Sequence, residues 1–208
     1  METINKTLNR LAVHGIQATR QNLNFSFGTP EQCRELFIEA FKAADSTIDQ
    51  YQHLPEYDQV ITWMTDTKGK GLLLAGSCGR GKSIILTGVL PIILMQRFNK
   101  IFIPYHANQI PGEINTIMKK WAIGLDEIGV EPQVNNYGER HEGFNTITDE
   151  VERHMKLLCI STNLNSKQIL ERYGERPLDR IYRHCKIIRF KGESLRHKYN
   201  QQNPKNEQ

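Results

Sequence analysis

The sequence lacks the cysteine pattern of a zinc site or of a disulfide framework. Its four cysteines, Cys33, Cys78, Cys159 and Cys185, are far apart in the chain and form no CxxC pair. The seven histidines show no metal-ligand spacing either. Isolated cysteines are typical of reduced thiols inside the cell, so we expect a cytoplasmic protein.

The sequence also lacks a hydrophobic segment long enough to cross a bilayer. Its most apolar run, IILTGVLPIILM at residues 84–95, is too short and is interrupted by proline and glycine. The first residues show no basic block followed by an apolar block, which a signal peptide would have. We therefore expect no membrane contact.

Neither sign of charge dominates the chain, but the charge is unevenly distributed. There are 27 Lys and Arg against 23 Asp and Glu in 208 residues, for a net charge of +4. From residue 166 to residue 208 we count 11 basic residues against 5 acidic ones, a local excess of +6. A basic segment favours an anionic partner, although a solvated surface produces the same composition.

Helical patterns occupy the first part of the chain. Residues 4–16 place apolar side chains on one helical face, and residues 29–44 repeat the pattern behind a Thr-Pro start with Gln32 in capping-box position. We interpret residues 1–46 as a small helical appendage, followed by a third helix from Pro55. Residues 47–196 then form the main domain, and residues 197–208 a polar tail.

Five short apolar segments in the main domain alternate with helical patterns. They cover residues 71–77, 100–107, 121–129, 156–162 and 186–192. Their continuous apolar character is typical of strands covered on both faces. The sequence therefore predicts an α/β fold in which helices sandwich a parallel sheet.

The clearest motif follows the first of these strands. GSCGRGKS matches GxxxxGK[ST] between a strand and a helix, the context of a P-loop. The motif predicts phosphate contacts from Gly76, Ser77, Cys78, Gly79, Arg80, Gly81, Lys82 and Ser83. In such a loop Lys82 reaches the β- and γ-phosphates of the nucleotide, and the Ser83 hydroxyl binds Mg²⁺.

Two later strands end in polar residues that suit nucleotide hydrolysis. Asp126 and Glu127 end an apolar strand, where Asp126 is the candidate Mg²⁺ ligand and Glu127 the base for the attacking water. The Glu neighbour favours ATP, and no guanine-reading NKxD motif is present. Asn163 follows the next strand as a candidate for orienting the water or sensing the γ-phosphate, or alternatively as a helix cap. Tyr105 and His106 end another strand, where they could stack on a base or could have a rim or core role instead.

The motifs together resemble a known family. GLLLAGSCGRGKS, LDEIG, STNL and RYGERPLDRIYRHCKIIRFKGESLR occur in the order found in the DnaC-like helicase loaders, which are AAA+ ATPases with the transposition helper IstB as a close cousin. The likeness covers about residues 50–196. It departs from the family at Cys78 and Arg80 in the phosphate loop and at Pro91, which interrupts the following helix.

The resemblance implies a RecA-like AAA+ core, ATP and Mg²⁺ as cofactors, and ATP-dependent self-assembly. It implies single-stranded DNA and a DnaB-like replicative helicase as partners, with the helical appendage gripping the helicase. By match with the family, Arg180 takes the place of an arginine finger. Arg176 lies beside it, and Arg196 falls near a second nucleotide-sensing arginine.

The helix around Arg180 can also be analysed without the family. A helix from Pro177 places Leu178, Ile181, Tyr182 and Cys185 on one face and Asp179, Arg180 and Arg183 on the other. If the apolar face packs on the core, the two arginines point outward, to water, to DNA or to a neighbouring subunit.

We therefore expect an ATP-hydrolysing helicase loader that acts on single-stranded DNA. Two alternatives stay open at this point. One is an IstB-like transposition helper that binds duplex DNA and a transposase. The other is a nucleotide-gated adaptor with negligible hydrolysis.

Overall fold

The computed structural model describes residues 3–15, 23–46, 51–131 and 142–195. Sixteen elements follow one another in the described part of the chain: α1 (Ile4–Val13), α2 (Pro30–Ala44), α3 (Pro55–Thr65), β1 (Gly71–Gly76), α4 (Lys82–Ile84), the π-helix η1 (Ile85–Val89), α5 (Leu90–Phe98), β2 (Pro104–His106), the 3₁₀ helix η2 (Ala107–Gln109), α6 (Ile110–Met118), β3 (Ala122–Ile128), α7 (Glu142–His154), β4 (Leu157–Thr162), α8 (Ser166–Tyr173), α9 (Glu175–His184) and β5 (Cys185–Phe190). None of the helices described is long and apolar enough to span a membrane.

The strands form one parallel sheet in the order β2-β3-β4-β1-β5. The predicted parallel sheet is therefore confirmed, and all five predicted strands are present. Only β2 is much shorter than expected, with three residues in place of residues 100–107. It lies at the edge of the sheet and begins at Pro104, which has no N–H group to extend the ladder.

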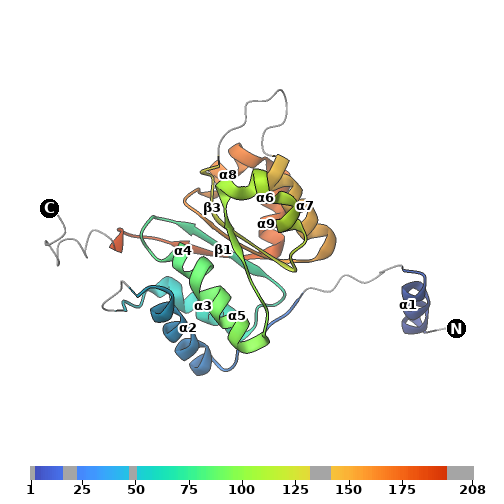
Figure 1. Ribbon diagram of the computed structural model, residues 1–208, viewed down its shortest axis with the longest axis horizontal. Helices are drawn as coiled ribbons and strands as arrows, with labels where there is room; N and C mark the ends of the chain where they lie inside the picture. Colours follow the sequence, from blue (N-terminus) through green and yellow to red (C-terminus); the bar gives the residue numbers. More distant parts are fainter. Residues whose placement is uncertain (1–2, 16–22, 47–50, 132–141, 196–208) are drawn as a thin grey trace, which may run out of the picture.

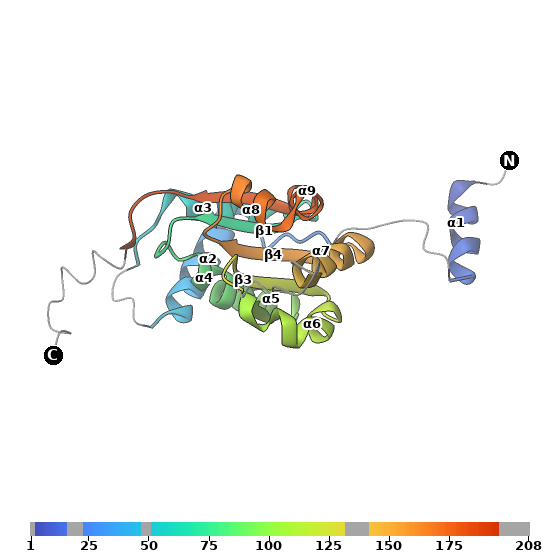
Figure 2. The same cartoon turned by 90° about the horizontal axis from the view of Figure 1, so that it is seen from above.

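Helices cover both faces of this sheet, as Figures 1 and 2 show. Successive β1 residues point to opposite sides: Leu72 and Leu74 lie in a core with α2, α3 and α5, whereas Leu73 lies in a second core with α7 and α9. This alternation follows from the period of two in a strand, and both sides are apolar because both are covered. The result is the predicted α/β sandwich.

The predicted boundary at residue 46 needs correction. Helix α2 begins with the expected capping box, in which Thr29 and Gln32 each accept the backbone N–H of the other. Its buried face, however, packs on α3: the ring centroids of Phe41 and Tyr57 lie 5.1 Å apart, and both residues belong to the core that contains Leu72. The aromatic side chains of α2 thus complete one layer of the sheet domain.

Helix α1 differs from α2, since none of its residues is buried. Ile4 and Val13 expose 74% and 83% of their surface. Of the two predicted appendage helices, only α1 stays outside the main core.

The helix after the phosphate loop accommodates Pro91 without breaking. Residues 82–98 run from α4 through the π-helical turn η1 into α5. A proline inside an α-helix lacks an N–H and crowds the carbonyl four residues earlier. The π-turn lies directly before Pro91 and gives the backbone room for the ring, so the predicted interruption is a local widening of the helix.

Candidate functional site

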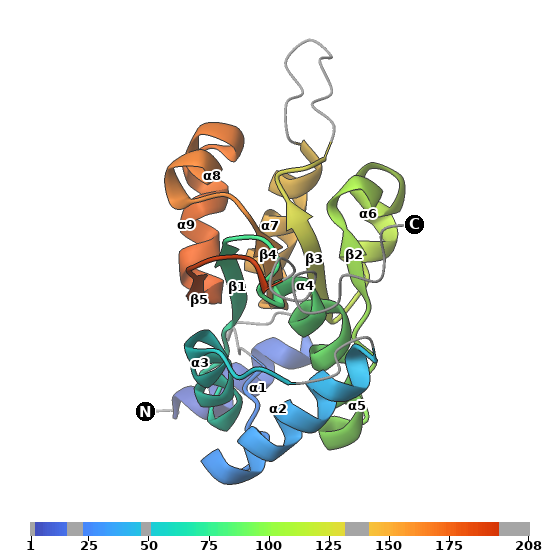
Figure 3. The ribbon, with the colours of Figure 1, turned by 90° about the vertical axis from the view of Figure 1, so that its left-hand side faces the viewer.

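The phosphate loop connects β1 to α4 at the carboxyl edge of the sheet (Figure 3). Two of its glycines are required by close packing. A Cβ on Gly76 would lie 2.1 Å from the carbonyl oxygen of Phe190, and one on Gly81 would lie 2.4 Å from the Tyr57 hydroxyl. Both glycines also have positive φ, of 126° and 82°, which favours glycine over other residues.

Lys82 lies at the centre of this loop. Its Nζ donates to the carbonyl oxygens of Gly76 at 2.8 Å and Ser77 at 2.7 Å, and to Oδ1 of Asn163 at 2.9 Å. The first two contacts fold the loop around the ammonium group. The third joins the loop to the residue that follows β4, so the structure brings together two residues predicted from separate motifs.

Asn163 is not the cap of helix α8. That role belongs to Asn165, whose side chain accepts the N–H of Gln168 at 3.0 Å while Gln168 Oε1 accepts the Asn165 N–H. The helix-cap alternative for Asn163 is therefore wrong. Its exposed side chain contacts Lys82 and lies beside the phosphate loop.

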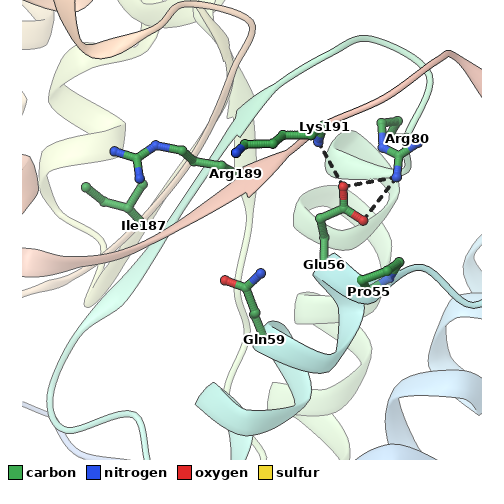
Figure 4. Close-up of a pocket in the computed structure, with 7 residues that line it drawn as sticks. All are labelled: Pro55, Glu56, Gln59, Arg80, Ile187, Arg189 and Lys191. Carbon is green, nitrogen blue, oxygen red and sulfur yellow. Dashed lines mark hydrogen bonds and ion pairs between the residues drawn. The ribbon is translucent and has the colours of Figure 1, made fainter.

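The other members of the loop differ in exposure. Ser77 and Cys78 are exposed, and Ser83 is half-buried at the start of the helix. The guanidinium of Arg80, by contrast, packs against Glu56 of α3, with Nη2 3.0 Å from both carboxylate oxygens (Figure 4). The charge of Arg80 is therefore neutralised by Glu56, whereas the phosphate contact expected from Arg80 as a loop residue stays a prediction.

Asp126 and Glu127 lie at the carboxyl end of β3, where the register with β4 shifts. Glu127 has a φ of 58°, an uncommon left-handed conformation for a residue with a side chain. Ser161 of β4 holds this bulge: its hydroxyl donates to the Asp126 carboxylate and accepts the Glu127 N–H at 2.9 Å. The bulge separates the two acidic side chains, so Asp126 is buried and Glu127 half-buried.

His106 is a neighbour of Glu127 that the sequence did not reveal. Its Nε2 lies 3.1 Å from Glu127 Oε2, and its Nδ1 accepts the Asn108 N–H at 3.2 Å. Because Nδ1 accepts, the proton is on Nε2 and is donated to Glu127. Sequence reasoning placed His106 at a strand end, but the lateral pairing of β2 with β3, which aligns His106 with Asp126, arises only in the folded sheet.

Of the two α9 arginines expected to point outward, Arg183 is exposed and Arg180 is not. Arg180 is buried and forms an ion pair with Asp149 of α7, and Arg183 lies 2.8 Å from Glu152 of the same helix. Arg176 contacts Asp149 at 3.4 Å and is otherwise exposed. The predicted outward orientation of Arg180 is wrong, because α7 lies over this side of α9 and supplies a carboxylate.

The face of α9 that was predicted to pack on the core is only partly buried. Tyr182, expected in the core, exposes 42% of its surface, and the buried residues are Pro177, Arg180, Ile181 and His184. The helix begins at Glu175, and its polar buried residues pair with α7, which an apolar pattern cannot indicate. Arg196 lies outside the described residues.

The donor set at the sheet edge is compatible with Mg²⁺ in a nucleotide complex. A hydroxyl from Ser83 and a carboxylate from Asp126 are oxygen donors, which Mg²⁺ prefers. Within the described ranges no cluster of three or more His, Cys, Asp or Glu residues exists that could hold a metal alone. A magnesium ion here would therefore depend on phosphate and water oxygens, as nucleotide-bound Mg²⁺ commonly does.

Comparison with known proteins gives the fold a precedent. No protein-family model and no curated protein matches the sequence. Among solved structures, DnaI matches with a TM-score of 0.57 and 18% identity over 74% of this chain and 94% of that one. The DnaC helicase loader matches at 0.54 and 16%, over 76% and 99%. AMPPCP-bound DnaA from Aquifex aeolicus matches at 0.50 and 12%, over 74% and 53%.

These likenesses confirm the expected fold. The five-stranded parallel sheet flanked by helices is similar to the folds of the solved DnaI, DnaC and DnaA structures.

Proposed function

We propose that the chain binds ATP with Mg²⁺, hydrolyses it, and acts as a loader of a DnaB-like replicative helicase on single-stranded DNA. The observation that supports this most is the meeting of Lys82 and Asn163 at 2.9 Å, beside a strand that ends in Asp126 and Glu127. The DnaC helicase loader among the structural neighbours supports the loader role.

The residues at the sheet edge have distinct proposed roles. Lys82 exchanges one of its present oxygen partners for the β- and γ-phosphates, and the exposed Asn163 is the partner that can move away. Ser83 and Asp126 hold Mg²⁺, which neutralises charge on the phosphates. Glu127 accepts a proton from the attacking water, and Asn163 orients that water or senses the γ-phosphate.

His106 would act on Glu127. Its hydrogen bond fixes one carboxylate oxygen, Oε2, in the described structure. The other oxygen remains available to a water molecule. His106 is thus a positioning residue for the proposed base.

Self-assembly is proposed to complete the site from a neighbouring subunit. In that arrangement Arg180 reaches the γ-phosphate bound by the next copy of the chain, with Arg176 beside it. Because Arg180 is now paired with Asp149, assembly has to exchange an internal carboxylate for an external phosphate. The stronger negative charge of the triphosphate favours that exchange.

Helix α1 is the proposed contact for the helicase. It is amphipathic in sequence, yet none of its residues is buried against the described part of the chain. An unpacked apolar face of this kind suits docking on a helical partner.

Two measurements test the proposal and separate it from its alternatives. Steady-state ATP turnover is measured with and without single-stranded DNA; a nucleotide-gated adaptor would show negligible turnover in both. Glu127→Gln protein, which should retain bound ATP, is then mixed with a purified replicative helicase and, separately, with a transposase and duplex DNA. ATP-dependent capture of the helicase supports the loader, whereas capture of the transposase alone supports the transposition helper.

A further inference from the structure

The phosphate loop carries a buried ion pair that the nucleotide chemistry itself does not use. Arg80 lies inside the loop, between two glycines with positive φ, and its side chain is only 10% exposed. Glu56, at the start of α3, is 8% exposed and meets Nη2 of Arg80 with both carboxylate oxygens at 3.0 Å. Figure 4 shows the pair at the edge of a pocket beside β5.

A third segment of the chain joins this pair. Arg80 Nη1 donates to the carbonyl oxygen of Glu193 at 3.2 Å, and the Lys191 N–H donates to Glu56 Oε1 at 2.8 Å. Gly192 lies between them; a Cβ there would come within 3.0 Å of Arg80 Nη1, at a φ of 112°. The segment directly after β5 is therefore shaped around the guanidinium.

Two further hydrogen bonds connect the phosphate loop to α3 and to the segment after β5. The Leu195 N–H donates to the Gly79 carbonyl oxygen at 3.0 Å, and the Tyr57 hydroxyl donates to the Arg80 carbonyl oxygen at 3.2 Å. The loop is thus held on one side by α3 and on the other by residues 191–195.

The charge state of Glu56 agrees with this role. Burial alone would raise the pKa of its carboxyl group, but the Lys191 N–H and the Arg80 guanidinium more than offset that effect and hold the pKa below its ordinary value. Glu56 is therefore ionised at neutral pH, and its loss would leave the Arg80 cation buried without its counter-ion.

We infer that Glu56 and Arg80 form a brace that sets the conformation of the phosphate loop and couples it to residues 191–195. Glu56 is then a positioning residue for phosphate binding, although it lies on α3 and, within the described ranges, hydrogen-bonds to no predicted nucleotide contact other than Arg80. The coupling also works in reverse, because displacement of residues 191–195 would pull on Gly79 and Arg80. The effect on nucleotide rests on the proposed ATP binding; the effect on loop conformation does not.

The first test of the brace needs no nucleotide. Amide hydrogen exchange is compared in Glu56→Gln and wild-type protein at residues 79–83 and 191–195. We expect exchange in both segments to rise together, by about tenfold or more, because local opening then costs less free energy. Asp58→Asn is the matched control: it breaks another Arg–carboxylate pair of α3, with Arg34 at 2.5 Å, which is about half exposed and, among the described residues, makes no hydrogen bond to the phosphate loop. Unchanged exchange in Glu56→Gln, or an equal rise in Asp58→Asn, would overturn the brace.

The second test uses ATP·Mg²⁺ as the probe. Glu56→Gln should weaken ATP affinity by about 10- to 100-fold, the range expected when a positioning interaction is removed. The double variant Glu56→Gln with Arg80→Gln removes the lone buried charge and lets two amides pair, so it should recover at least part of that affinity. Wild-type affinity in the single variant, or no recovery in the double variant, would contradict the brace. Absence of ATP binding by the wild-type protein would instead refute the proposed function and leave the exchange test to judge the brace.

Discussion

Arg180 of α9 forms an ion pair with Asp149 of α7 within the same chain. The guanidinium is buried, and burial lowers the pKa of Arg180, but an arginine remains charged at neutral pH. Asp149 is a third exposed, so water can reach the carboxylate side of the pair. The residue that resembles an arginine finger is therefore held internally by a bond that a neighbouring phosphate would have to replace.

The ion pair of Arg180 leads to a prediction for mixtures of two inactive variants. Arg180→Ala should retain ATP binding but lose most hydrolysis, by about 10³-fold or more if the residue is a trans finger. Lys82→Ala is inactive at its own site but still carries Arg180. Mixing the two inactive proteins should restore partial ATP turnover, measured after dilution has allowed subunits to exchange.

Arg183→Ala is the control for this experiment. It removes the adjacent α9 arginine, whose partner is Glu152 at 2.8 Å, without touching Asp149. It should hydrolyse ATP nearly as the wild type does. If exchange is demonstrated and the mixture stays inactive, Arg180 does not act in trans and its role is limited to the α7–α9 interaction.

Lys82 and Glu127 should separate binding from hydrolysis. Lys82→Ala removes the cation whose ammonium organises the loop, so ATP binding should fall below detection in a direct binding assay. Glu127→Gln removes only the proposed base and should bind ATP with wild-type affinity while hydrolysing it about 10²-fold more slowly or worse. Wild-type turnover by Glu127→Gln would show that another residue activates the water.

Cys78 should be the thiol that reports nucleotide binding. It is exposed in the phosphate loop, whereas Cys33, Cys159 and Cys185 are buried. Burial raises the pKa of Cys159 to about 12, so its reactive thiolate is scarce at neutral pH. We expect alkylation of Cys78 alone, followed by mass spectrometry, and protection by ATP·Mg²⁺. Alkylation that ignores nucleotide would place Cys78 outside the pocket.

Binding of single-stranded DNA should depend on the cations of β5 and of the residue after it more than on those of α9. Arg189 and Lys191 line the pocket beside β5 and have no carboxylate partner among the residues described, whereas the α9 arginines are paired with α7. Arg189→Ala with Lys191→Ala should weaken DNA binding and lower the slope of log K against log salt by about 0.7 for each phosphate that is no longer neutralised. Arg183→Ala should leave the slope unchanged. A slope that the double variant does not alter would place the DNA elsewhere.

The Glu56–Arg80 pair predicts a specific dependence of stability on pH. A carboxyl group whose pKa is lowered in the folded state contributes stability above its ordinary pKa, and this contribution is lost as the pH falls through the folded-state pKa. Glu56→Gln should therefore lower the free energy of unfolding by about 1–3 kcal/mol at neutral pH. The difference from wild type, followed by denaturant unfolding, should shrink in acid. A difference that does not change with pH would mean that ionised Glu56 is not its source.

The sequence alone determined the features that depend on local periodicity and on backbone-bound motifs. Continuous apolar segments such as residues 71–77 predict buried parallel strands. The sharp turns of the phosphate loop require glycines, so the glycine spacing predicts the loop. The capping box at Thr29 was visible for the same reason, because its partners are three residues apart. The residues in these interactions are close together in the sequence. They therefore meet in almost any fold in which the same helix, strand or loop forms.

Only the tertiary structure decided which distant side chains neutralise one another. Arg80 and Glu56 are 24 residues apart, and His106 reaches Glu127 through the pairing of β2 with β3. Arg180 looked free on a helical projection because Asp149, on another helix, does not appear in it. A charged residue is buried only where a counter-charge offsets its desolvation, and that partner is chosen by the packing of helices on the sheet rather than by local sequence.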